Sequence, residues 1–125
     1  MLGSKDAVAT VAVKDLTAAK TFYEQSVGLT RLSGESAESA MYKTGNGKLF
    51  VYKSRFAGTN QATAVTWVAG DDVEAIVETL KSKGVRFEHY EFPNSTLKGD
   101  VHHTGEIRAA WFKDPDGNIH AIVSR

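Results

Sequence analysis

Histidine side chains have the widest chemical range of the groups in this sequence, because imidazole titrates near neutral pH and binds divalent metals. The chain contains four of them, His89, His102, His103 and His120. A fold that brought His102, His103 and Glu106 together would create a displaced metal or acid–base site. Solvated loop histidines are the simpler interpretation. The sequence has no cysteine, which excludes disulfides, iron–sulfur clusters and thiol nucleophiles.

The acidic pairs are better explained by local structure than by paired-carboxylate catalysis. Asp71 and Asp72 immediately precede an amphipathic segment, where an aspartate caps a helix, and Asp114 and Asp116 belong to an Asp-Pro-Asp-Gly turn. The sequence also lacks a phosphate-binding loop, a Gly-x-Ser-x-Gly nucleophile elbow and a His-Glu-x-x-His zinc motif. With no recognisable catalytic motif, enzyme activity is uncertain and a non-enzymatic role is favoured.

The elements that would hold these residues occur as an internal repeat. Residues 9–16 and 66–73 have similar sequences, and aligning them places Asp15 over Asp72. In both copies a strand-like stretch runs into an aspartate at the position where a helix N-cap accepts bonds from free backbone amides. The repeat therefore predicts two modules that each begin with a strand, a capping aspartate and a helix.

Apolar residues at helical spacing after each aspartate predict helices over about 16–26 and 73–83. Gly28 and Gly84 follow at the positions where a residue in the left-handed conformation ends a helix. Strand-like sequence comes after each glycine. It occupies 29–32, 40–43, 48–53, 85–92, 107–113 and 118–123.

The order of these elements predicts the fold class and the organisation of the chain. Each half is βαβββ, so we expect a single α+β domain over 1–125, with module one at about 7–53, a linker at 54–64 and module two at about 65–123. The stretch 93–106 is predicted to be a long loop, because it contains no clear strand pattern.

Composition and charge exclude several classes of protein. The 125 residues are 42% hydrophobic and 24% charged, as in one globular domain. Fifteen basic and fifteen acidic residues give a net charge of zero, which argues against a nucleic-acid partner. The longest nearly apolar stretch, Ala7 to Val13, is far shorter than a membrane span, and the first residues lack a secretory-signal pattern. We therefore expect no membrane partner and a cytoplasmic location.

The duplicated βαβββ plan resembles the vicinal oxygen chelate superfamily, the group of glyoxalases, bleomycin-resistance proteins and ring-cleaving dioxygenases. The resemblance extends from Ala7 to Val123, and its most specific part is the Asp-Pro-Asp-Gly-Asn run at 114–118. It implies that the two modules pair into an open, curled mixed sheet, with helices on the convex face and a ligand cavity on the concave face. It also implies a homodimer.

The resemblance further allows a test for the metal site of the family. Enzymes of this family hold a divalent metal through His, Gln or Glu on the first and last strands of each module. The corresponding positions here are Val8, Phe50, Val65 and Ala121. None of these side chains is an ordinary ligand for a divalent metal. We therefore predict no metal and no other cofactor at these positions, and reactions that need a metal Lewis acid are disfavoured.

Apolar residues at those four positions predict a cavity for a small, partly apolar molecule. Strand alternation would add Thr10 beside Val8, Tyr52 beside Phe50 and Trp67 beside Val65. Two residues of the linker could cap this cavity, Phe56 and Asn60. Trp111 is expected to face the same side as His120 and to pack in the interior, whereas His120 should turn away from the face of Ala121.

Three hypotheses for function remain open at this point. The first is a metal-free binding protein, dimeric as the resemblance implies, that holds a small molecule in the aromatic-lined cavity. The second is an enzyme, such as a lyase, isomerase or dioxygenase-like protein, that uses protein acid–base groups or a relocated metal site. The third is an interaction module whose cavity is filled by its own side chains. Only the second requires an ionisable group inside the cavity.

Overall fold

The computed structural model describes residues 1–33 and 36–125. Module one forms β1 (Ala9–Val13), α1 (Leu16–Thr21), a short π-helix (Phe22–Ser26), β2 (Thr30–Arg31), β3 (Ser39–Thr44) and β4 (Gly47–Lys53). Module two forms β5 (Thr63–Val68), α2 (Val73–Ser82), β6 (Phe87–Glu88), β7 (Ser95–Lys98), β8 (Val101–Thr104), β9 (Ile107–Lys113) and β10 (Ile119–Val123). Short 3-10 helices occur at Leu2–Ser4 and Gly70–Asp72. Among the described residues, no helix is long and apolar enough to cross a membrane.

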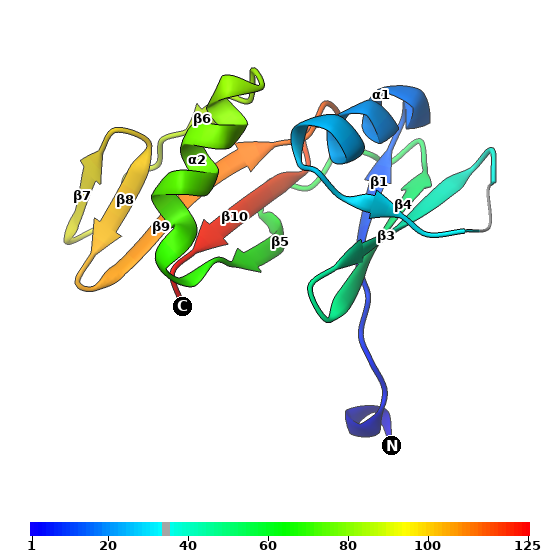
Figure 1. The fold of residues 1–125 in the computed structure, drawn as a ribbon, viewed down its shortest axis with the longest axis horizontal. Coiled ribbons are helices and arrows are strands. Elements are labelled where there is room, and N and C mark those ends of the chain that lie inside the picture. Colours follow the sequence, from blue (N-terminus) through cyan, green and yellow to red (C-terminus); the bar gives the residue numbers. More distant parts are fainter. Residues whose placement is uncertain (34–35) are drawn as a thin grey trace.

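The strands form two mixed sheets that lie side by side (Figure 1). Sheet one has the order β1-β4-β3-β2, and sheet two has the order β5-β10-β9-β8-β7, with β6 paired to β9. In each sheet the first strand of the module pairs in parallel with the last, β1 with β4 and β5 with β10, and the other pairs are antiparallel. The predicted α+β class with two helices and two mixed sheets is confirmed. Module one has the predicted βαβββ order, whereas module two contains the additional strands β7 and β8.

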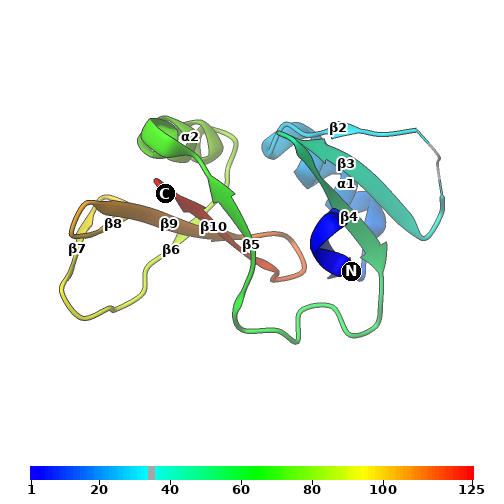
Figure 2. The ribbon, with the colours of Figure 1, turned by 90° about the horizontal axis from the view of Figure 1, so that it is seen from below.

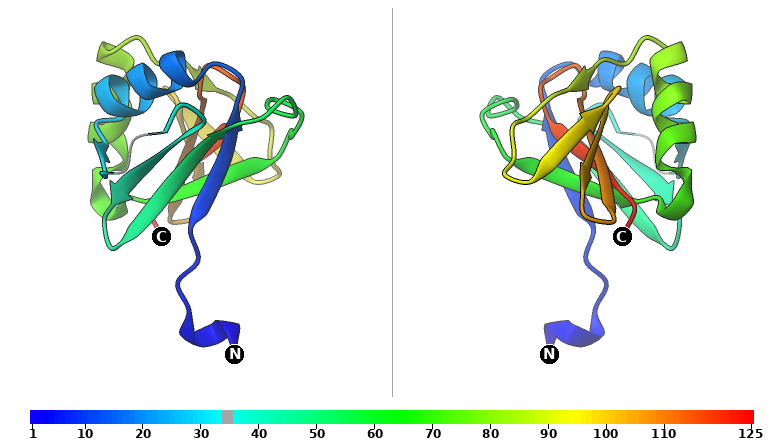
Figure 3. Two further views of the ribbon diagram at one scale, coloured as in Figure 1. Left: turned by 90° about the vertical axis from the view of Figure 1, so that its right-hand side faces the viewer. Right: turned by 90° about the vertical axis from the view of Figure 1, so that its left-hand side faces the viewer.

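The helices α1 and α2 cover the same side of the two sheets and leave the opposite side uncovered (Figures 2 and 3). We call the uncovered side the open face. The sheets meet along β1 and β5 and do not close into a barrel within one chain (Figure 2). The open face is therefore where the chain presents sheet side chains that its own helices leave uncovered.

The helices begin and end where the sequence predicts, with one difference. The Asp15 carboxylate accepts a 3.0 Å hydrogen bond from the Ala18 backbone N–H, and Gly28 and Gly84 have φ angles of 82° and 87°. Asp72 occupies the N-cap position of α2 but forms no side-chain capping bond, so that part of the prediction is wrong. The 3-10 turn that ends at Asp72 gives this residue a backbone conformation outside the extended region typical of a cap.

The predicted long loop at 93–106 is wrong, because it contains the hairpin of β7 and β8. Gly99 and Gly105, with φ angles of 63° and 59°, stand first in two-residue turns that join β7 to β8 and β8 to β9. A glycine at that position is typical of a type II′ hairpin turn. The predicted strand over 85–92 is reduced to Phe87–Glu88, because β8 occupies the rest of the edge of β9.

Two apolar clusters form the core, one under each helix. The cluster in module one includes Val11, Leu49 and Val51, and the cluster in module two includes Val77 and Phe112. Three partly buried side chains pack against both clusters and so join the modules. They are Phe22, Val27 and Trp67.

The linker between the modules packs against the Asp-Pro-Asp-Gly turn. Ala57 is buried, and Gly58 has a φ angle of 77° and lies so close to the turn that a Cβ atom there would be 2.6 Å from the Asp116 carbonyl oxygen. A larger residue at position 58 would strain the backbone and clash with a backbone atom. The Asp-Pro-Asp-Gly turn of module two is thereby packed against the linker that follows β4 of module one.

Candidate functional site

Four rings of module two gather on the open face of sheet two. Trp111 of β9 has its ring centroid 5.0 Å from that of His102 on β8, 5.5 Å from that of Tyr90 and 5.3 Å from that of Phe92. Tyr90 and Phe92 belong to the segment between β6 and β7, which crosses this face (Figure 2). The contacts are edge-to-face or tilted, the geometries that aromatic rings prefer.

A cavity of about 520 Å³ opens beside this cluster, and we call it the aromatic cavity. Its lining consists of His89, Tyr90, Glu91, Phe92, Ser95, Leu97 and His102. The volume is within the range of small-molecule sites, which combine apolar walls with a few polar groups. His102 is only 2% exposed, whereas Phe92 and Leu97 are among the exposed large apolar residues. The cavity thus has a buried inner wall and an accessible apolar rim.

Three buried polar atoms of the lining have no hydrogen-bond partner among the residues that the structure describes. They are the Tyr90 hydroxyl, the Ser95 hydroxyl and Nδ1 of His102. The other ring nitrogen of His102 lies 3.0 Å from the Tyr90 backbone N–H, which can donate to it, and 3.1 Å from the Tyr90 carbonyl oxygen. Leaving a buried polar atom unpaired costs about 1–3 kcal/mol. Polar groups of a bound molecule would remove this cost.

The ionisation state of Tyr90 favours hydrogen-bond donation. Burial raises the pKa of its hydroxyl, and the nearby Glu88 carboxylate adds to the shift. The phenol therefore remains protonated at neutral pH. At the rim, Asp100 accepts hydrogen bonds from Lys81 at 2.8 Å and from His89 at 2.7 Å, and the pKa of this carboxyl is lowered by both. The rim thus carries an ion-pair cluster, and the interior keeps neutral donors.

The predicted site residues of module one lie together on the open face of sheet one. Thr10 is the neighbour of Phe50 in the parallel pair of β1 and β4. The rings of Phe50 and Tyr52 stack with centroids 5.9 Å apart, as expected for residues two apart on one strand. Val8 lies just before β1 and is exposed. This group forms an uncovered aromatic surface.

In module two Ala121 lies on the open face of sheet two, as predicted for a cavity residue. The same prediction is wrong for Val65 and Trp67, which lie on the helix side. Ala121 is opposite Trp111 and beside Thr66. Val65 is instead buried in the core of module one, and Trp67 packs between the two cores on the helix side. The prediction counted back from Asp72 and did not allow for the 3-10 turn at 70–72, and a shift of one residue along a strand reverses the face.

The expected packing of Trp111 is also wrong. His120 pairs with Phe112, and Ala121 pairs with Trp111, so Trp111 and His120 point to opposite faces of sheet two. His120 does turn away from the face of Ala121, as predicted. Trp111 lies on the open face with its indole N–H directed to the Thr63 hydroxyl at 3.2 Å.

His120 is fully buried in a polar network that joins the two modules. The Trp67 indole N–H donates to its Nδ1 at 3.0 Å, so the neutral ring carries its proton on Nε2, which donates to the Tyr23 hydroxyl at 2.9 Å. The Tyr23 hydroxyl in turn donates to Asp114 at 2.6 Å, and Asn118 donates to the same carboxylate oxygen at 2.8 Å. Burial lowers the pKa of His120 to about 4, which keeps the ring neutral.

The remaining predicted residues do not line the aromatic cavity. Phe56 is 63% exposed beneath the Arg55 guanidinium, and the Asn60 amide is paired with the backbone of Ala62. His102 and His103 are successive residues of one strand and so point to opposite faces.

The interpretation of His102 as a solvated loop residue is wrong, because it is buried on β8. Glu106 is paired with Arg125, away from the aromatic cavity. Within residues 1–33 and 36–125, no group of three or more His, Asp or Glu side chains could hold a metal ion.

Sequence reasoning missed the aromatic cavity because it treated 93–106 as a loop. Two signals could have found it. Gly99-Asp100 and Gly105-Glu106 are two-residue hairpin turns, and they would have placed His102 on a strand beside that of Trp111. Tyr90 and Phe92 show the alternation of side chains that share one face.

Comparison with known proteins identifies a family and several solved structures with a similar fold. The model of the Glyoxalase/Bleomycin resistance protein/Dioxygenase superfamily matches residues 6–122. No curated protein matches the chain.

Three solved structures illustrate the similarity in fold. Lactoylglutathione lyase from Agrobacterium tumefaciens has 18% identity and a TM-score of 0.71, covering 96% of this chain and 92% of its own. The fosfomycin resistance protein FosX from Mesorhizobium loti has 12% identity and a TM-score of 0.70, covering 100% and 94%. Oxidase ChaP-H2 has 24% identity and a TM-score of 0.67, covering 94% and 91%. These likenesses concern the fold.

Proposed function

The chain belongs to the glyoxalase/bleomycin resistance protein/dioxygenase superfamily, and from this premise we propose that it binds a small, partly apolar molecule in its aromatic cavity. The observation that carries the proposal is that the rings of Tyr90, Phe92 and His102 line one cavity whose lining residues also hold three buried polar atoms unpartnered among the described residues. The rings would stack on a flat apolar body, and the polar atoms would bind one or two oxygen or nitrogen atoms of the ligand. A flat aromatic alcohol has this combination.

The proposed binding does not use a metal held at the positions that the family uses. Phe50 and Ala121 carry no donor, and the open-face neighbour of Ala121 on β5 is Thr66, whose neutral hydroxyl is a poor replacement for His or Glu. Val65 carries no donor and points into the core. The residues present therefore do not fit a divalent metal there, and no step of the proposal passes through one.

A second copy of the chain is the partner we propose for the open face. Tyr52, Val68 and Phe92 leave large apolar areas exposed on a chain whose two sheets do not close on one another. In a two-fold dimer, the stacked Phe50 and Tyr52 of one copy would cover the aromatic cavity of the other. Light scattering after size exclusion should give twice the 13.6 kDa chain mass, and Tyr52→Lys should shift the mass toward that of the monomer.

A specific observation also favours a second candidate function. Nδ1 of His102 and the Tyr90 hydroxyl are both buried and unpartnered among the described residues, and the two rings stack with centroids 6.4 Å apart, so the cavity lining contains two groups that can move a proton. A lyase or isomerase that works by general acid–base catalysis would need such a pair. Incubating an identified ligand with the protein separates the candidates. A binding protein returns the ligand unchanged, whereas an enzyme converts it and His102→Gln abolishes the conversion.

The first experiment is native mass spectrometry of the protein as purified, followed by NMR titration with 2-naphthol. We expect saturable shifts of the Tyr90 and His102 ring signals, with at least about tenfold weaker binding in Phe92→Ala, which removes a ring of the cavity lining. Phe56→Ala is the matched control, because it removes an exposed ring outside the cavity lining. Unsaturable shifts, or equal losses in both variants, would show that the aromatic cavity is not the site.

A further inference from the structure

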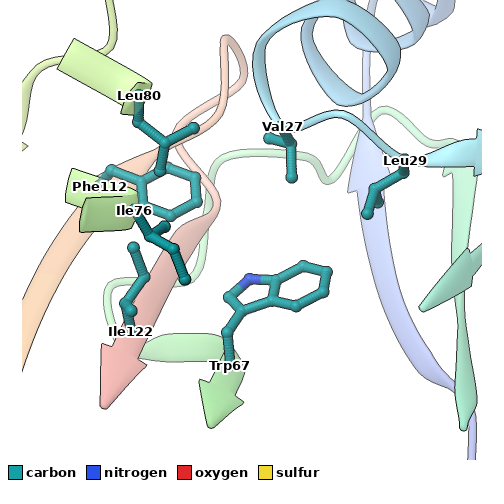
Figure 4. A pocket seen from close by; sticks show the side chains of 7 residues that line it. All are labelled: Val27, Leu29, Trp67, Ile76, Leu80, Phe112 and Ile122. Atoms are coloured by element: carbon teal, nitrogen blue, oxygen red, sulfur yellow. The ribbon is translucent and has the colours of Figure 1, made fainter. Parts of the chain in front are cut away.

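We propose that the chain has a second ligand site, for a single-ring apolar aromatic molecule, in a pocket between the two modules on the helix side. This inter-module pocket has a volume of about 210 Å³. It is lined by Val27, Leu29, Trp67, Ile76, Leu80, Phe112 and Ile122 (Figure 4). The aromatic cavity lies on the other face of sheet two, so neither proposal rests on the other.

Both modules contribute walls to the inter-module pocket. Val27 and Leu29 come from the end of the π-helix and the residues after it, and α2 contributes Ile76 and Leu80. The indole ring of Trp67 extends from β5 into the space between these walls (Figure 4). A molecule bound there would contact both modules at once and would stabilise their arrangement by mass action.

The chemistry of the lining selects an apolar ligand. All seven side chains are apolar except for the Trp67 indole N–H, and that group already donates to His120 at 3.0 Å. A ligand hydroxyl or carboxylate would therefore lose its water without gaining a hydrogen-bond partner, which disfavours polar ligands. An aromatic hydrocarbon or halobenzene has no polar group to leave unpaired.

The size of the pocket agrees with a single ring. An apolar cavity of about 150 Å³ lined by Leu, Ile and Phe binds benzene. The inter-module pocket is larger than this and is lined by the same residue types with a tryptophan added. Aromatic rings stack or meet edge-to-face at centroid distances of about 4.5–7 Å, so Trp67 and Phe112 could both contact one bound ring.

The test uses bromobenzene, which carries a heavy atom that quenches tryptophan fluorescence on contact. The chain has two tryptophans, so Trp111→Phe leaves Trp67 as the only reporter. We expect saturable quenching of Trp67, and saturable methyl NMR shifts at Val27, Leu29 and Ile76. Unsaturable quenching up to the solubility limit, or methyl shifts spread over the whole chain, would overturn the proposal.

Ile76→Phe fills the pocket from α2 and should weaken bromobenzene binding by at least about tenfold. Glu78→Phe is the matched control, because it places the same ring on the exposed face of the same helix and should bind as the wild type does. Circular dichroism and thermal unfolding check that both variants fold. If Ile76→Phe fails to fold, Val27→Leu narrows the opposite wall and should weaken binding in the same direction.

The two proposals fail separately. If the wild-type chain does not bind 2-naphthol saturably but shows saturable bromobenzene quenching, the aromatic cavity alone is refuted. Equal bromobenzene affinity in Ile76→Phe and Glu78→Phe would refute the inter-module pocket alone. Competition between the two probes would refute their separation, because the sites lie on opposite faces of sheet two.

Discussion

The buried imidazole of His120 should make folding stability depend on pH in a defined window. Its pKa is about 4 in the folded chain, because burial disfavours the charged form, and 6.5 is the ordinary value for an exposed histidine. Above pH 6.5 both folded and unfolded chains carry the neutral ring. As the pH falls from 6.5 to 4, the unfolded chain takes up a proton that the folded chain does not, so stability is lost.

The magnitude follows from the size of the pKa shift. Each pKa unit corresponds to about 1.36 kcal/mol, so a shift from 6.5 to about 4 gives a loss of about 3 kcal/mol by the lower end of the window. Domains of this size have free energies of unfolding of about 5–15 kcal/mol. The protonation of one histidine would therefore remove a large part of the stability.

Urea unfolding between pH 7.5 and 4, followed by tryptophan fluorescence, measures this loss directly. His120→Gln keeps a polar side chain that does not titrate, so its stability should fall by about 3 kcal/mol less than that of the wild type over the window. His103→Gln is the matched control, because it removes a half-buried histidine of β8 and leaves the network of His120 intact. It should retain the pH dependence of the wild type.

Two results would refute this reasoning. One is an NMR titration of the His120 imidazole with a midpoint near 6.5 in the folded protein, which would mean that burial does not exclude the charged ring. The other is an equal pH dependence of the wild type and His120→Gln, which would assign the acid loss to other groups. The carboxylates titrate in both proteins and cancel in the comparison.

Three further predictions concern stability and are checked by urea unfolding at pH 7. Gly58→Ala should lower the free energy of unfolding by about 1–3 kcal/mol, because the new Cβ meets the Asp116 carbonyl oxygen at 2.6 Å and the φ angle of 77° disfavours a side chain. An unchanged free energy would show that the linker moves freely. Tyr23→Phe should lower the free energy of unfolding by about 1–3 kcal/mol, because it removes a buried hydroxyl that donates to the Asp114 carboxylate. An unchanged free energy would mean that water replaces the hydroxyl. Asp15→Ala should lower the free energy of unfolding by about 1 kcal/mol and Asp72→Ala should leave it nearly unchanged, because of the two only Asp15 forms a side-chain capping bond. Equal losses in the two variants would contradict this.

Local sequence patterns were sufficient for the two helices, for most of the strands and for the family. The capping Asp15, the left-handed Gly28 and Gly84 and the apolar spacing between them depend only on neighbours within a few residues, and the structure confirms each of them. The Asp-Pro-Asp-Gly-Asn turn identified the superfamily for the same reason, since Asp114 accepts hydrogen bonds from backbone N–H groups within its own turn.

Which face a strand residue occupies was decided by the tertiary structure. Trp67 and Trp111 were both assigned to the wrong side, because strand alternation gives a relative face and a shift of one residue reverses it. The register comes from pairing with strands that are distant in sequence, and from the 3-10 turn at 70–72 that no periodic pattern revealed.

The sequence by itself therefore determined the α+β class and its two helix-and-sheet modules. Only the tertiary structure brought Tyr90 and His102 to one cavity, with Trp111 packed against both, and linked His120 to Tyr23 across the modules. Elements are stabilised by contacts between residues near in sequence, whereas a cavity requires strands far apart in the chain to lie side by side, and that arrangement depends on packing that no local pattern encodes.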